Sequence, residues 1–149
     1  MATQWTAGTT AGQVLTAATL NTIGAAWVDY TPTLTQGVTV TKTISYARYC
    51  QFQKTIIVQV LLIATSAGTA AAEVAIGLPL TATGSLSRAN GTGFVYDASA
   101  NVIYNMTSFL NSTTTAKFYY QSGFGFGTSP AITLANTDQL SFTFIYEAA

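Results

Sequence analysis

The sequence predicts an all-β protein: an antiparallel β-sandwich of jelly-roll-like form, preceded by a short N-terminal arm that contains one helix. Apolar and polar residues alternate with a period of two through most of the chain after Trp27, as in half-buried strands. Turn-forming residues separate these alternating stretches at short intervals. The 149 residues are 49% hydrophobic and 12% aromatic and include 27 threonines, a composition that favours strands. No helical crossovers are predicted between the strands, which argues against a parallel α/β sheet.

The arm is assigned to residues 1–26 and the β-domain to residues 27–149. Thr16 is a typical helix N-cap, because its hydroxyl can accept a hydrogen bond from a free amide of the first turn. The helix would run from Ala17 to Ala26 and place Leu20, Ile23 and Trp27 on one side. Ten residues do not make a stable helix alone, so we expect the arm to pack on a partner or on its own domain.

Eight to ten short strands are expected, each bounded by turn residues. In chain order the strand segments are Val28–Leu34, which contains Pro32, then Val38–Thr41, Tyr46–Phe52, Thr55–Ala64, Glu73–Ile76, Phe94–Tyr96, Val102–Tyr104, Met106–Leu110, Ala116–Tyr120 and Gln139–Tyr146. A five-residue loop, 97–101, should join the hairpin of Phe94–Tyr96 and Val102–Tyr104.

The segment Thr55–Ala64 is apolar on both faces. Its even-numbered residues form one wholly apolar face, and Ile57, Leu61 and Ile63 lie on the other face around Gln59. A strand of this kind is usually buried on both sides, so we expect the second face to be covered by a neighbouring subunit. The 18 uncharged residues 55–72 reach the length of a membrane span, but their polar interruptions and β-branched residues favour a strand. No membrane insertion is expected, and the N-terminus lacks the basic region of a signal peptide.

The charge content excludes several functions. Only 7% of residues are charged, with five basic and five acidic side chains and no histidine. The five basic residues lie scattered from Lys42 to Lys117, so nucleic-acid binding is not expected. Histidine-dependent catalysis and histidine metal sites are impossible in one chain. Cys50 has no intrachain disulfide partner, and we expect a buried structural thiol. We therefore predict no enzymatic activity, no cofactor and no metal site.

An aromatic group near the C-terminal third has two interpretations. It comprises Phe118, Tyr119, Tyr120, Phe124 and Phe126. Exposed aromatic side chains suit recognition of carbohydrate or protein, because they present rigid faces at low entropic cost. On this interpretation Tyr119, Tyr120, Phe124 and Phe126 would form a recognition surface. The favoured alternative places the group in the sandwich core and a subunit interface.

The start of the β-domain resembles a known pattern. Residues 27–35, Trp-Val-Asp-Tyr-Thr-Pro-Thr-Leu-Thr, resemble the W-x-x-Y-T-P-T-L-T opening of small β-rich modules in the virion proteins of tailed bacteriophages. The segment 46–54 stands where that family has a Y-x-x-x-G-K turn, with Gln53 in place of the usual glycine. A Leu-Pro pair at residues 78–79 and the closing stretch 137–147, with Thr137 in place of a glycine, are also similar.

The arm carries a second resemblance. Residues 12–22 are similar to the G-x-x-L-T-A-A-x-L-N leader of phage minor tail proteins. Together these resemblances imply a jelly-roll-like virion module, a homotrimer that attaches to other virion proteins through residues 1–26. The attachment residues would be Val14, Leu15, Leu20, Ile23 and Trp27.

The resemblance leaves the position in the virion open. The favoured expectation is a minor tail or tail-tip protein able to contact a glycan or protein of the host surface. The alternative is a capsid decoration or head-fibre protein. A secreted lectin-like carbohydrate-binding domain is a third alternative.

Overall fold

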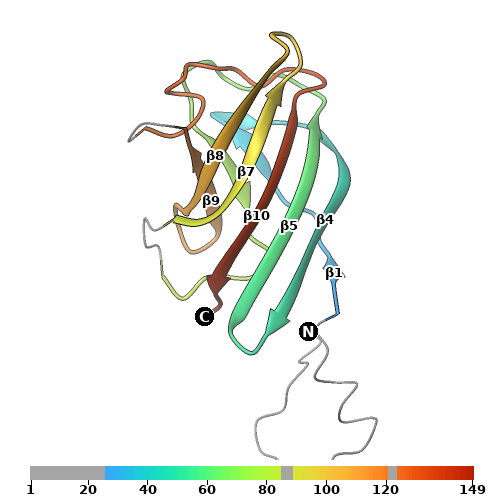
Figure 1. Ribbon diagram of the computed structural model, residues 1–149, viewed down its shortest axis with the longest axis vertical. Coiled ribbons are helices and arrows are strands. Elements are labelled where there is room, and N and C mark those ends of the chain that lie inside the picture. The colour runs from blue at the N-terminus through green and yellow to red at the C-terminus, as the bar shows by residue number, and fades with distance from the viewer. Residues whose placement is uncertain (1–25, 85–88, 121–123) are drawn as a thin grey trace, which may run out of the picture.

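The computed structural model describes residues 26–84, 89–120 and 124–149, and every regular element among them is a β-strand (Figure 1). The ten strands are β1 (Val28–Asp29), β2 (Leu34–Gln36), β3 (Val38–Thr39), β4 (Lys42–Phe52), β5 (Thr55–Ala64), β6 (Val74–Gly77), β7 (Ala89–Asp97), β8 (Val102–Leu110), β9 (Thr115–Tyr119) and β10 (Gln139–Glu147). The predicted all-β class and number of strands are confirmed. The helix expected at Ala17–Ala26 falls almost wholly outside the described residues, as does the arm.

All ten strands belong to one antiparallel sheet, in the order β1-β4-β5-β10-β7-β8-β9-β6-β2-β3. The sheet curls so that β9, β6, β2 and β3 lie behind the long strands in Figure 1. The curl brings together residues of strands that are not neighbours in the sheet. Phe118 of β9 stacks on Phe142 of β10 with ring centroids 3.7 Å apart. The core therefore lies inside the curl.

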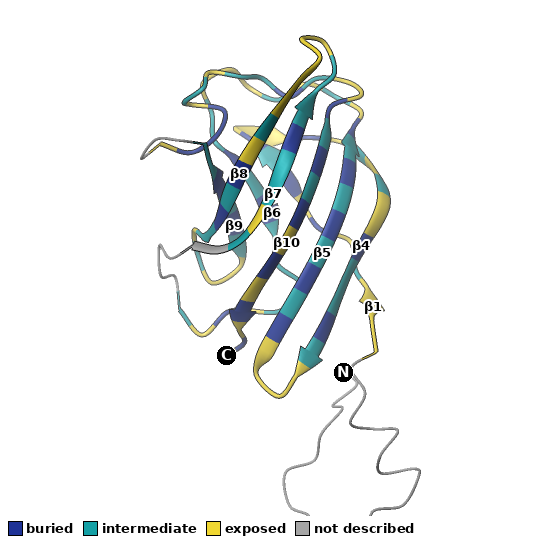
Figure 2. Cartoon of the chain, viewed as in Figure 1, coloured by how far each residue is buried: buried dark blue, intermediate teal, exposed yellow. Residues whose placement is uncertain are grey.

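The long strands β5 and β10 are adjacent in the sheet, and their inward residues are continuously apolar. The fully buried inward residues are Ile56, Val58, Val60 and Leu62 on β5, and Leu140 and Phe144 on β10. The register pairs Leu140 with Leu62 and Phe144 with Val58, so each inward row is apolar across both strands. Figure 2 shows the alternation of buried and more exposed residues along these strands. The predicted apolar face of Thr55–Ala64 is confirmed.

The first predicted strand is divided in the structure. The segment expected at Val28–Leu34 forms β1 over two residues and then leaves the sheet before β2 begins at Leu34. Pro32 lies in the break, because proline has no N–H to contribute to a strand ladder. The strand expected at Val38–Thr41 is likewise only two residues long. By contrast, Val102–Tyr104 and Met106–Leu110 merge into the single strand β8.

A buried glutamine on β2 holds two loops next to the sheet. The Gln36 side chain is fully buried, and its Nε2 donates to the carbonyl oxygens of Ala72 (3.1 Å) and Ile132 (2.6 Å). Its Oε1 accepts a hydrogen bond from the amide of Leu134 at 2.7 Å. One side chain of β2 thus fixes two loops that are far apart in sequence.

Candidate interaction surface

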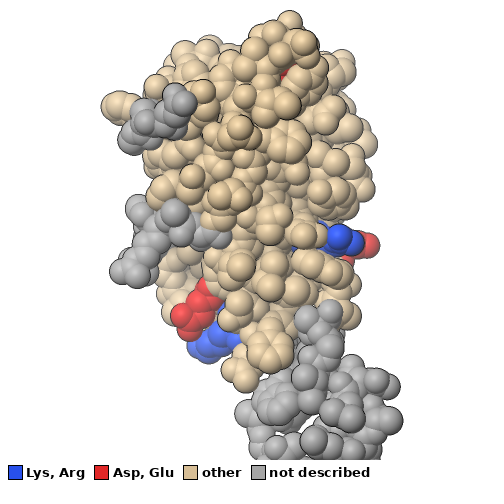
Figure 3. All heavy atoms as spheres, in the orientation of Figure 1, with Lys and Arg blue, Asp and Glu red and all other residues tan. Residues whose placement is uncertain are grey.

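The outer face of the sheet is the largest surface that the strand register builds from uncharged side chains. We define it as the outward residues of β4, β5, β10, β7 and β8. Cross-strand pairing arranges them in rows: Cys50, Ile57 and Ile145; Arg48, Gln59, Thr143, Thr92 and Thr107; Tyr46, Leu61, Ser141, Phe94 and Asn105; and Thr43, Ile63, Gln139, Tyr96 and Ile103. A further outward row at the strand ends comprises Phe52, Thr55 and Glu147, so Arg48 and Glu147 are the charged residues of these rows. In Figure 3 the charged atoms lie chiefly toward the margins of the view.

The outer face has an apolar part on β5 and β10. Ile57, Leu61 and Ile63 are each partly exposed, and Ile145 is 49% exposed. The prediction that Thr55–Ala64 is apolar on both faces is confirmed for its composition. Its outer side, however, is not buried by any described residue of the same chain. An apolar sheet surface left half exposed is a typical feature of a protein interface.

Arg48 is held at the β4 end of the outer face by neutral and aromatic partners. Its Nε and Nη2 both donate to the Gln59 Oε1, at 3.2 and 3.0 Å. The guanidinium carbon lies 4.8 Å from the ring centroid of Trp27 and 5.6 Å from that of Tyr46. Trp27 is the one predicted attachment residue that is described, and it is 41% exposed. Val14, Leu15, Leu20 and Ile23 lie outside the described residues.

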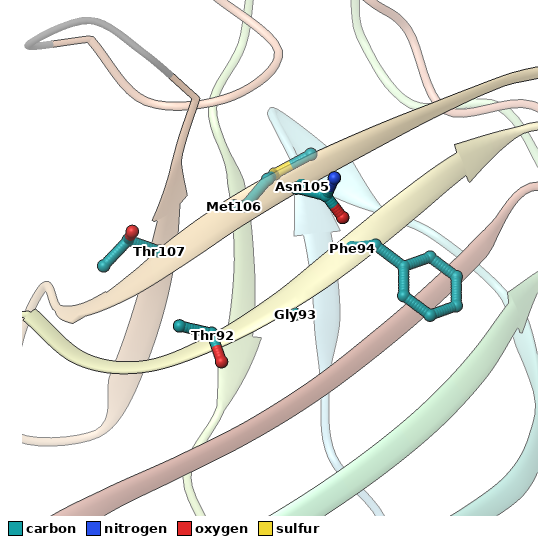
Figure 4. Close-up of a pocket in the computed structure, with 6 residues that line it drawn as sticks. All are labelled: Thr92, Gly93, Phe94, Asn105, Met106 and Thr107. Atoms are coloured by element: carbon teal, nitrogen blue, oxygen red, sulfur yellow. The ribbon is translucent and has the colours of Figure 1, made fainter.

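A shallow groove of about 460 Å³ lies on the outer face between β7 and β8 (Figure 4). It is lined by Thr92, Gly93, Phe94, Asn105, Met106 and Thr107. Thr92, Phe94, Asn105 and Thr107 belong to the outward rows, whereas Gly93 and Met106 belong to the inward side. This groove could not be predicted from the sequence, because its side chains come from two strands whose register the sequence does not define.

The predicted recognition aromatics are divided between the surface and the core. Phe124 is 63% exposed, and Tyr119 is partly exposed with its ring edge-on to Phe109 at 4.6 Å. Tyr120 packs edge-on against Tyr104. Phe126 is fully buried, which corrects its prediction as a surface residue. Its amide donates to the Phe118 carbonyl oxygen, and this bond holds Phe126 against the core.

The aspartate carboxylates accept hydrogen bonds chiefly from backbone amides, and one glutamate forms an ion pair with a lysine. The buried Asp138 side chain accepts hydrogen bonds from the amides of Ala98 (2.9 Å) and Ala135 (2.8 Å), and burial raises the pKa of its carboxyl group. Asp97 accepts from the amide of Ala100 and the hydroxyl of Ser99, and these bonds lower the pKa of Asp97. Both aspartates thus organise the β7–β8 hairpin loop.

Glu73 forms an ion pair with Lys117 and also accepts a hydrogen bond from the Gly125 amide at 3.1 Å. Within the described ranges, no group of three or more histidine, cysteine, aspartate or glutamate residues is placed to hold a metal ion. No helix in that part of the chain is long and apolar enough to cross a membrane. Cys50 is a free, buried thiol, as expected.

Tyr30 is partly buried and Tyr146 is buried, and both pack in or against the core. The Tyr146 hydroxyl donates to the Leu80 carbonyl oxygen (2.8 Å) and accepts from the Leu80 amide (3.2 Å). The Tyr30 hydroxyl has no hydrogen-bond partner in the described part of the chain. Burial raises the pKa of both phenols, that of Tyr146 to about 12.

No protein-family model matches the chain, and comparison with curated proteins and with solved structures gave no match either.

Proposed function

We propose that this chain is a non-enzymatic structural protein of a tailed-bacteriophage virion. In this proposal it is a homotrimeric minor tail or tail-tip component that can contact the host surface, with residues 1–26 attached to other virion proteins. The curled sheet would be a jelly-roll-like module in which each copy covers part of its neighbour. The proposal rests on the resemblance of segments 12–22, 27–35 and 137–147 and on the outer face of the sheet.

The outer face is the observation that carries the proposal. Ile57, Leu61, Ile63 and Ile145 place apolar surface on the outside of the adjacent strands β5 and β10, with no charge among them. Removing such surface from water stabilises an assembly by roughly 25 cal/mol per Å². A second copy of the chain is a partner of the same low charge, so few ions would meet at the contact. Arg48, bonded to Gln59, is the cation that lies beside it.

The two edges of the sheet differ in length. The β3 edge is two residues long and offers few free backbone groups to another chain. At the other edge β1 pairs with only Arg48 and Tyr49 of the 11-residue strand β4, so a longer stretch of backbone is open there. We place the subunit contact on the outward side chains of β5 and β10 because the apolar surface lies there.

The same surface also fits a capsid decoration or head-fibre protein, and particle imaging distinguishes the two. Gold-labelled antibody against this chain should mark the tail or tail tip of intact particles. Label on the capsid shell would instead support the decoration function. Protein that is secreted free and never sediments with particles would contradict a virion function and support the lectin-like alternative.

A further inference from the structure

The groove between β7 and β8 differs chemically from the apolar part of the outer face. Thr92, Asn105 and Thr107 line it with two hydroxyls and one carboxamide, and the Phe94 ring projects from β7 on the side nearer Asn105 (Figure 4). Its volume, about 460 Å³, lies within the roughly 300–1,000 Å³ typical of small-ligand sites. Hydrogen-bonding groups and an aromatic ring on a rigid hairpin can bind a ligand with both polar and apolar surface.

The polar side chains that line the groove can still bind a ligand. The side chains of Thr92, Asn105 and Thr107 make no hydrogen bond with any of the residues described. A carboxamide offers two donors and an acceptor oxygen, and each hydroxyl both donates and accepts. The groove therefore presents donors and acceptors side by side, which is the pattern that matches vicinal hydroxyl groups.

Aromatic rings flank these groups on two sides. Phe94 pairs with Asn105 across the hairpin, and Thr107 pairs with Tyr119 of β9, whose ring packs against Phe109. The C–H face of a pyranose ring packs on an aromatic ring while its equatorial hydroxyls point sideways to polar groups. Tyr119 is a residue for which the sequence already predicts surface recognition.

The charges near the groove argue against an ionic ligand. No charged residue lines it. Lys117, on the neighbouring strand β9, is paired with Glu73. Among the described residues no free cation lines the groove to bind a phosphate or carboxylate, whereas a neutral ligand needs none.

We propose that the β7–β8 groove binds a neutral saccharide, with Phe94 as the stacking platform and Asn105, Thr92 and Thr107 as the hydrogen-bonding groups. This inference does not depend on the virion function, because it follows from the groove alone. The groove lies on β7 and β8, beside the apolar part on β5 and β10, so saccharide binding and subunit association can be tested separately.

The test is a titration of the full-length ¹⁵N-labelled protein with neutral hexasaccharides at millimolar concentration. The probes are maltohexaose, cellohexaose, mannohexaose and chitohexaose, and hexagalacturonate is the acidic control. At least one neutral probe should shift the amide signals of Thr92–Phe94 and Asn105–Thr107, and hexagalacturonate should not. No shift at these positions with any neutral probe would overturn the proposal, as would stronger binding of hexagalacturonate or of unstructured peptides.

Substitutions then assign the roles. Phe94→Ala and Asn105→Ala should each weaken binding by about tenfold or more at unchanged melting temperature. If Phe94→Ala impairs folding, the isosteric Thr107→Val serves in its place. Phe52→Ala removes another exposed phenylalanine, at the far end of β4, and should leave binding unchanged. Binding that survives Phe94→Ala and Asn105→Ala would contradict the site. Leu61→Lys, aimed at the subunit contact, should retain saccharide binding even if the protein becomes monomeric.

Discussion

Gln36 is the clearest case of a single side chain that holds distant parts of this fold. Replacing it by alanine removes three buried hydrogen bonds and leaves the carbonyls of Ala72 and Ile132 without this donor. We expect Gln36→Ala to lower the free energy of unfolding by about 2–4 kcal/mol, measured by urea denaturation. Gln51→Ala is the matched control, since it removes one exposed bond and should cost less than about 1 kcal/mol. Equal costs for the two variants would contradict this role of Gln36.

Tyr30 and Tyr146 should respond differently to loss of their hydroxyl groups. Tyr30→Phe removes a buried hydroxyl with no partner among the described residues, so the melting temperature should stay the same or rise. Tyr146→Phe breaks both bonds to Leu80 and should destabilise the protein by about 1–2 kcal/mol. A lower melting temperature for Tyr30→Phe than for Tyr146→Phe would show that the Tyr30 hydroxyl has a partner.

Asp138 should give stability a specific pH dependence. Burial raises the pKa of its carboxyl group above the ordinary value of 3.8, so the folded chain holds this proton more tightly than the unfolded chain. Its contribution to the free energy of unfolding therefore falls as pH rises from 3.8 through the raised pKa. Asp138→Asn removes this titration, so the stability of the wild type relative to the variant should decline over that window.

Asp97 is the control, because its contribution to stability should change with pH in the opposite direction. Its hydrogen bonds lower its pKa below 3.8, so its contribution is present above 3.8 and is lost as pH falls through the lowered pKa. Asp97→Asn should thus alter the pH profile only below about 3.8. Parallel profiles of the wild type and Asp138→Asn above 3.8 would contradict the account of Asp138.

At the scale of the element, β7 shows how closely the strands pack inside the curl. A Cβ atom built on Gly93 would lie 2.1 Å from the Ser141 carbonyl oxygen and 2.3 Å from a ring carbon of Phe142. Gly93→Ala therefore forces β7 and β10 apart and should lower the free energy of unfolding by about 1–3 kcal/mol. Gly84→Ala is the matched control, because no atom lies within 4 Å of its added Cβ. Similar melting temperatures for the two variants would contradict the close packing of β7 on β10.

Elements with strong alternation could be predicted from the sequence, and short elements could not. Strands β5 and β10 begin and end near their predicted bounds because an apolar face of four or more residues defines them. Strands β1 and β3 are two-residue ladders, too short to produce a period. The burial of Gln36 was also not predictable, because its partners are backbone groups of loops 36 and about 100 residues away.

For the candidate surfaces too, residues that share one strand could be predicted to lie together, and residues on different strands could not. Ile57, Leu61 and Ile63 could be assigned to one face because they share a strand. Phe94 and Asn105 belong to different strands, and only the register β7–β8 makes them neighbours. The burial of the aromatic residues 118–126 could be predicted only in part, because the sequence does not distinguish a buried Phe126 from an exposed Phe124.

At the scale of the whole molecule, the low charge content and the outer face have one explanation. The charged residues are few, and two of them, Arg48 and Glu147, lie on the outer face, where Gln59 and aromatic rings hold Arg48. The face has its apolar residues on the adjacent strands β5 and β10, where a flat partner surface would reach them. In the proposed assembly a neighbouring copy covers these residues, which would explain both the low charge and the apolar outer side chains.

The mass of the full chain in native mass spectrometry at micromolar concentration tests this claim most directly. We predict a species of three times 15.6 kDa for the wild type, and monomer for Leu61→Lys and for Ile145→Lys. Val38→Lys, which changes an exposed valine on β3 at the opposite edge of the sheet, should remain trimeric. A wild-type monomer of 15.6 kDa, or trimers that persist in Leu61→Lys and Ile145→Lys, would contradict the assignment of the subunit contact to the outward side chains of β5 and β10.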